Sequence, residues 1–217
     1  MNNIAAFEER MTEEQRRIFR SLDSLQKIQA FLDKTPYSTD HGNRSPLRVL
    51  RDRVAHCLDG ALFAAAAIQR LGDPPIVIDL LPEAGRDDDH VLVLFQRNGC
   101  YGALAKSNYP GLRYREPIFR TLRELALSYF EWFFNMERQK TLRGYTETLD
   151  LRRFDSLNWL WEDSAADEIE RSFARLRRYR LVTPTQKEQL LAVDDLLFQA
   201  GTLGVDPKGL FQLGEHE

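Results

Sequence analysis

Two residues of this 217-residue chain, Cys57 and His90, have the side chains and the positions for covalent chemistry. A cysteine thiolate can attack an acyl carbon, and a histidine can take the thiol proton and return it to the leaving group. Cys57 stands at the start of an alanine-rich apolar stretch, and His90 directly precedes the β-branched run Val91–Phe95. The sequence therefore predicts a nucleophile and its base at a helix–strand junction.

The segment before Cys57 leaves two interpretations of the thiol open. If a helix begins at Cys57, its unpaired N–H groups and its dipole lower the pKa of the thiol and can bind an oxyanion. Ser45-Pro46 is also a good helix start, and a helix that continues from there through residue 57 places the thiol in mid-helix. An inert core cysteine is the corresponding alternative, because free cysteines are among the most buried residues.

Helical periodicity dominates the two ends of the chain. Thr12 and Gln15 form a candidate capping box before apolar residues spaced three and four apart from Ile18 to Leu32. The stretch that holds Cys57 is expected to end at Gly72. Further helices are expected over 122–133, 164–179 and 184–200.

The middle of the chain has the pattern of β-strands. Ile76–Leu81 and Val91–Phe95 are short runs rich in branched residues, and Cys100–Ala105 follows the turn signal Asn98-Gly99. A two-residue turn pairs residue 97 with residue 100 and, by the same register, places Ser107 opposite His90. The sequence thus predicts an α+β protein with an antiparallel hairpin beside the helix that carries Cys57.

These segments resemble the transglutaminase-like superfamily, whose core is papain-like. The matching pieces are AHCLDGALFAAAAIQRLG, DDDHVLVLFQRNG and CYGALAKSN, which lie within residues 45–108. The run KSNYPGLRYREPIFRTLRELALSYFEWFFN is similar to that of a bacterial subgroup of largely unassigned function. The resemblance implies a papain/transglutaminase-like domain over 1–150, and we expect a helical extension over 151–217 packed on the same core.

The family pattern places an acidic residue on the strand after the histidine, and this chain departs from it there. The matching position is Ala105, whose methyl group cannot accept the imidazole N–H. Ser107 shares the face of His90 by strand alternation and is the geometric substitute. Asn108 is the chemical substitute, since papain-like enzymes use an amide in this role, although alternation points it away.

The resemblance implies cysteine-dependent acyl transfer or hydrolysis of an amide, ester or thioester, with a peptide or another acyl substrate. Arg113 and Arg115 are candidates for binding an anionic substrate group; a surface loop with local ion pairs is their alternative. The missing acidic residue leaves open a second function, a non-catalytic family member that serves as a binding or scaffold protein. A metal site built from His90 and the acidic residues beside it is a third possibility, but we expect no metal and no cofactor.

Composition excludes several other classes. The net charge of −3 and a pI near 5.9 argue against nucleic-acid binding. No apolar run reaches the roughly 20 residues needed to cross a membrane, and the amino-terminal segment lacks the pattern of a secretory signal. Two cysteines do not make a disulfide framework, so we expect a cytoplasmic protein. The sequence indicates no oligomeric state.

Overall fold

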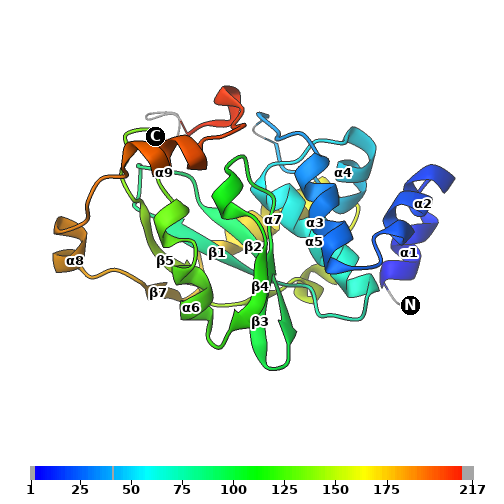
Figure 1. Ribbon diagram of the computed structural model, residues 1–217. Coiled ribbons are helices and arrows are strands. Elements are labelled where there is room, and N and C mark those ends of the chain that lie inside the picture. The colour runs from blue at the N-terminus through cyan, green and yellow to red at the C-terminus, as the bar shows by residue number, and fades with distance from the viewer. Residues whose placement is uncertain (1–2, 41, 212–217) are drawn as a thin grey trace.

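The computed structural model describes residues 3–40 and 42–211 as an α+β arrangement (Figure 1). Five helices precede the first strand: α1 (Asn3–Glu9), α2 (Glu13–Ser21), α3 (Leu25–Lys34), α4 (Pro46–Asp52) and α5 (Cys57–Arg70). The predicted capping box starts α2, because Thr12 accepts from the backbone of Gln15 while the Gln15 side chain accepts from the Thr12 backbone. The periodic stretch from Ile18 to Leu32 is divided between α2 and α3, since the helix ends at Leu22 and Ser24 caps the next one.

A single antiparallel sheet follows. Its strands are β1 (Ile76–Pro82), β2 (His90–Arg97), β3 (Cys100–Leu104), β4 (Arg115–Phe119), β5 (Leu142–Thr146), β6 (Leu149–Asp150) and β7 (Arg178–Arg180). The strand order is β4-β3-β2-β1-β5-β7, and β6 pairs with β1. Residues 97 and 100 face each other as predicted, because Asn98 and Gly99 both adopt the positive φ that a type I′ turn requires.

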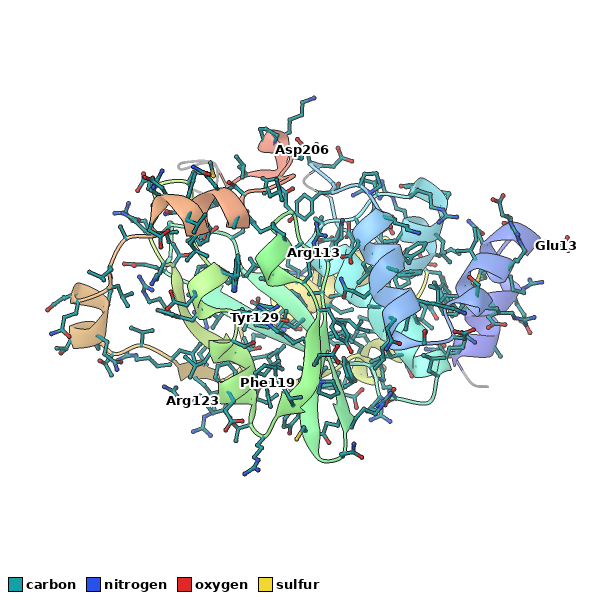
Figure 2. All side chains as sticks on the ribbon, viewed as in Figure 1. Glu13, Arg113, Phe119, Arg123, Tyr129 and Asp206 are labelled. Atoms are coloured by element: carbon teal, nitrogen blue, oxygen red, sulfur yellow. The ribbon has the colours of Figure 1, made fainter. Side chains whose placement is uncertain are left out.

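The two faces of the sheet are covered by different parts of the chain. On one face, α5 packs over Val91, Val93 and Phe95 together with the amino-terminal helices and α7 (Asp163–Phe173). On the other face, α6 (Leu122–Leu127) and the 3-10 turn η2 (Phe130–Trp132) pack over Leu92 and Leu94. Figure 2 shows side chains filling the space between the helices and the sheet. The expected fold class, a cysteine-bearing helix packed on an antiparallel sheet, is confirmed.

Several expected helices are shorter than the sequence patterns predict. The helix over 122–133 is replaced by α6 and η2, and 184–200 holds two helices, α8 (Pro184–Glu188) and α9 (Asp195–Gly201). The expected helix over 164–179 stops at Phe173, and residues 178–180 form β7 instead. The carboxy-terminal part is therefore not purely helical: it contributes β7, which pairs with β5, and α7, whose apolar side joins the α5 cluster. Residues 212–217 of the expected extension lie outside the described residues.

The remaining short helices are η1 (Pro110–Leu112), η3 (Leu151–Leu157) and η4 (Pro207–Gly209). Within residues 3–40 and 42–211, no helix combines the length and the apolar character required to cross a bilayer.

Candidate functional site

Cys57 is the first residue of the 14-residue helix α5. The helix that starts at Pro46 does not continue to it, because Arg53 takes a left-handed conformation (φ 57°) and ends α4. The backbone N–H of His56, the residue before Cys57, donates to Asp59 at 3.3 Å, which closes the first turn. The structure thus places a half-buried free thiol at a helix start, as in the first of the two interpretations of position 57, but the thiol pKa is raised and not lowered as that interpretation expects.

His90 lies in a closed aromatic environment. Its Nε2 is 2.7 Å from the carbonyl oxygen of Leu112, and its ring centroid lies 6.4 Å from that of Tyr129 and 6.5 Å from that of Phe133. Its side chain is almost fully buried, with 4% exposed. Burial lowers the pKa of His90 to about 4, so the ring is neutral near pH 7 and must donate its Nε2–H to Leu112.

Strand alternation explains why the structure does not bring Cys57 and His90 together. His90 pairs with Leu80, and both belong with the side chains on the α6 side of the sheet. Val91, the next residue, faces α5 and lines the same cleft as Cys57. Because successive side chains of a strand point to opposite faces, the thiol and the imidazole lie on opposite sides of β2. The expected Cys–His contact is not formed in this structure.

The acidic segment 87–89, and not the imidazole of His90, lies beside the thiol. The sulfur of Cys57 lies 3.9 Å from the backbone oxygen of Asp89. Burial raises the pKa of the Cys57 thiol well above its usual value, and the negative charges of Asp89, Asp79 and Asp88 raise it further. Burial also raises the pKa of Asp79, which is 1% exposed, and the adjacent Asp89 adds to the effect. The local field therefore keeps the sulfur protonated.

Cys57 opens on a cleft of about 420 Å³. Four acidic residues and a single lysine are among its lining residues: Asp40, Asp88, Asp89, Glu170 and Lys208. Aromatic side chains from three separate segments complete its wall: Tyr37, Phe173 and Phe211. The described lining is thus negatively charged, with apolar rings beside the charges.

A buried ionic network supports the wall of the cleft. The backbone N–H of Arg44 donates to Asp59 Oδ1 at 2.6 Å, and its guanidinium lies 3.4 Å from Asp59 Oδ2. The Nε2 atom of His56 lies 3.2 Å from Asp59 Oδ1. Burial lowers the pKa of His56 to about 4, and the positive charge of Arg44 makes a second, smaller contribution to this decrease. The network therefore fixes a neutral imidazole at the rim beside Cys57.

Ser107 and Asn108, the two candidates for orienting His90, have other partners. Ser107 Oγ accepts from the backbone N–H of Tyr109 at 3.0 Å, and both Ser107 and His90 border a small cavity of about 30 Å³. Asn108 Nδ2 donates to the carbonyl oxygens of Asp206 and Gly209, at 2.9 and 3.1 Å. Asn108 thus holds the carboxy-terminal segment. Both roles in orienting the ring stay predictions from the sequence.

The two arginines expected to bind substrate lie outside the cleft. Arg115 donates to the backbone oxygens of Gly111 and Ser128 and stacks on Tyr129, with 3.9 Å from its guanidinium carbon to the ring centroid. Arg113 Nη1 lies 3.7 Å from Asp33 Oδ1. The residues that line the Cys57 cleft include neither of them. These contacts agree with the alternative that the sequence left open, local ion pairs and structural hydrogen bonds.

The acidic stretch beside His90 is the metal site that the sequence leaves open. Asp87 Oδ2 accepts from Thr141 Oγ1 at 2.6 Å, and burial raises the pKa of Asp87 to about 6. Among residues 3–40 and 42–211, no group of three or more histidine, cysteine or acidic side chains has an arrangement that could hold a metal ion.

Sequence reasoning missed three residues in and around the site: Tyr37, Asp59 and Gln29. Asp59 follows His56 by three residues, which is the spacing of a helix-capping pair and could have indicated its role. Gln29 brackets Ala105, accepting from its N–H and donating to its carbonyl at 3.2 and 2.9 Å. No local signal marks that pair, because the two residues are far apart in sequence.

Comparisons with known proteins give weak likenesses. No family model matches the chain, and no curated protein matches its sequence. Among solved structures, LapG from Legionella pneumophila is 17% identical with a TM-score of 0.36, covering 48% of this chain and 70% of that one. EGTA-treated LapG from the same organism is 14% identical with a TM-score of 0.40, covering 76% and 95%. Membership of the transglutaminase-like superfamily stays a prediction from the motifs.

Proposed function

We propose that this protein binds a positively charged ligand, such as a lysine-bearing peptide, in the cleft beside Cys57, and does not act as a Cys57–His90 hydrolase. The observation that carries the proposal is the acidic lining next to the thiol, with the imidazole of β2 on the other face. The same carboxylates that disfavour a thiolate favour a cation. Aromatic side chains at the rim can add cation–π attraction.

Calorimetric titration with acetyl-Gly-Lys-Gly-amide tests this function, with the norleucine analogue as the uncharged control. We expect binding of the lysine peptide only, weakening as salt is raised because partly exposed charges are screened. Equal binding of both peptides, or of neither, would overturn the proposal.

Two variants provide a matched pair for the same titration. Asn43 donates to Asp167 and to Glu170, both at 2.9 Å, but only Glu170 lines the cleft. We expect Glu170→Gln to weaken the lysine peptide several-fold, because it removes a charge facing the ligand. Asp167→Asn, which removes a charge behind the cleft, should leave the affinity nearly unchanged.

A second function, acyl transfer by Cys57, is favoured by the position of the thiol at a helix start that opens on a cleft. His56 would serve as the base: its Nε2 lies 3.2 Å from Asp59 Oδ1, and its buried ring is neutral and can take the thiol proton. The sulfur would attack an ester carbonyl, and the alcohol would depart. Incubation with p-nitrophenyl acetate tests this: acetylation of Cys57, lost in His56→Gln, supports it, and labelling no faster than at Cys100 excludes it.

A further inference from the structure

The carboxy-terminal segment forms part of the cleft wall. After α9 the chain turns through η4, and Figure 1 shows this red segment next to the blue loop that precedes α4. Four consecutive residues, Lys208 to Phe211, line the cleft together with Cys57. Figure 2 labels Asp206 at the start of this segment. We call residues 206–211 the strap.

Asn108 holds the strap through its main chain. The Asn108 side chain accepts from the backbone N–H of Asp206 at 2.9 Å and donates to the carbonyl oxygens of Asp206 and Gly209. An amide that offers both a donor and acceptors to a backbone recognises an extended or turning peptide whatever its side chains. Asn108 is itself 6% exposed, so these hydrogen bonds form in a largely dry site.

Gly209 fits closely against the cleft wall. A Cβ atom at this position would lie 2.7 Å from Tyr37 Cδ1 and 3.0 Å from Asn108 Nδ2. Only a residue without a side chain can therefore lie flat on the Tyr37 ring while its carbonyl accepts from Asn108. Lys208, next to it, is an exposed residue and is the one lysine among the described lining residues of the acidic cleft.

From these contacts we infer that the Cys57 cleft is a peptide-binding groove, one wall of which is formed here by the chain's own strap, and that the strap restricts access to the thiol. This rests on the proposed function and extends it: the ligand is a peptide segment read through its main chain, with a lysine followed by glycine. A peptide from another molecule must displace the strap in order to bind, so the strap competes with that peptide for the groove.

Alkylation of the full-length protein with iodoacetamide at pH 9 tests the inference, because the protein carries its own reference thiol. Cys57 lines the cleft, whereas Cys100 starts β3 and does not. We expect Gly209→Ala and Asn108→Ala each to raise the ratio of Cys57 to Cys100 labelling rates by about tenfold, which corresponds to ~1.4 kcal/mol of strap stability. Gly42→Ala is the matched control, since its Cβ would meet no atom within 4 Å.

Addition of a peptide with the sequence of residues 203–211 should return the labelling ratio of Gly209→Ala to the wild-type value. The same peptide with alanine at its glycine should not. An unchanged labelling ratio in both strap variants, with melting temperatures that show that both are folded, would overturn the inference about the strap. If the strap opens but the lysine tripeptide still fails to bind, the inference about the strap stands and the proposed function fails.

Discussion

At the start of β2, two consecutive residues face two different environments. Val91 points towards α5 and lines the open acidic cleft that also contains the Cys57 thiol. His90 points the other way, where Tyr129 and Phe133 enclose its ring and a carbonyl takes its only N–H. The open face has charge and a cleft of about 420 Å³ without a base from β2, and the closed face has a base beside a cavity of only about 30 Å³. A shift of one residue along β2 therefore decides which face a side chain occupies, and so which chemistry that face can support.

The largest difference between the faces should appear when a ring is removed from the closed one. We expect Phe133→Ala to lower the free energy of unfolding by about 3–5 kcal/mol, because the cavity it leaves cannot collapse. Affinity for the lysine tripeptide should not change. Urea unfolding and calorimetric titration measure the two effects.

Phe173→Ala is the counterpart on the open face, since Phe173 lines the cleft and is 7% exposed. We expect it to weaken the lysine tripeptide. A Phe133→Ala protein with altered affinity, or a Phe173→Ala protein with unaltered affinity, would show that the faces are not independent.

The strand pattern and the hairpin could be predicted from the sequence because both depend on residues that are close together in the chain. Asn98-Gly99 dictates its turn, and the turn dictates the register that pairs residue 97 with residue 100. The direction of His90 was harder to predict. Alternation puts His90 on one face and Val91 on the other, but which face α5 covers depends on long-range packing.

The missed elements share the same cause. β4, β5 and β7 lack strong alternation and become strands through pairing with distant partners. The sequence offered Asn108 as a partner for His90, but the partners observed for its side chain are about 100 residues later in the chain and carry no signal near residue 108.

Acid should destabilise the protein through both buried histidines. His90 and His56 have pKa values lowered to about 4 in the folded protein, against about 6.5 when unfolded. The unfolded chain therefore binds protons that the native one does not, so stability is complete above pH 6.5 and is lost as pH falls towards 4. Each should account for about 2 kcal/mol of the loss between pH 7 and 5.

Urea midpoints of His90→Gln and His56→Gln across this range separate the two contributions. Glutamine at position 90 keeps an amide N–H that can donate to the carbonyl oxygen of Leu112. His90→Gln should therefore be the less destabilised of the two variants near pH 7. Asp59 and Asp87, whose pKa values burial raises to about 7 and about 6, take up protons in the folded protein over the same range and act in the opposite direction, so the histidine effect is the difference between each variant and the wild type. Each variant should lose about 2 kcal/mol less than the wild type between pH 7 and 5, and a variant that follows the wild-type curve would contradict the neutral burial of that ring.

The smallest effect is expected at the thiol itself. We expect Cys57→Ala to change the free energy of unfolding by less than about 1 kcal/mol, because Cys57 is half-buried and its sulfur makes weak hydrogen bonds, such as the 3.9 Å contact with the backbone oxygen of Asp89. Affinity for the lysine tripeptide should be retained. Cys100→Ala serves as the comparison by urea unfolding, and a loss several times larger at Cys57 would indicate a structural role for the thiol.

The most direct test is the pH profile of Cys57 alkylation in wild type and in His90→Gln. The carboxylates around the sulfur and its burial raise the pKa of the thiol, so they predict labelling that rises only well above about pH 8.5, the ordinary thiol value, with the same profile in both proteins. Rapid labelling near neutral pH that is lost in His90→Gln would show that the imidazole reaches the thiol, and would contradict the separation of the two faces.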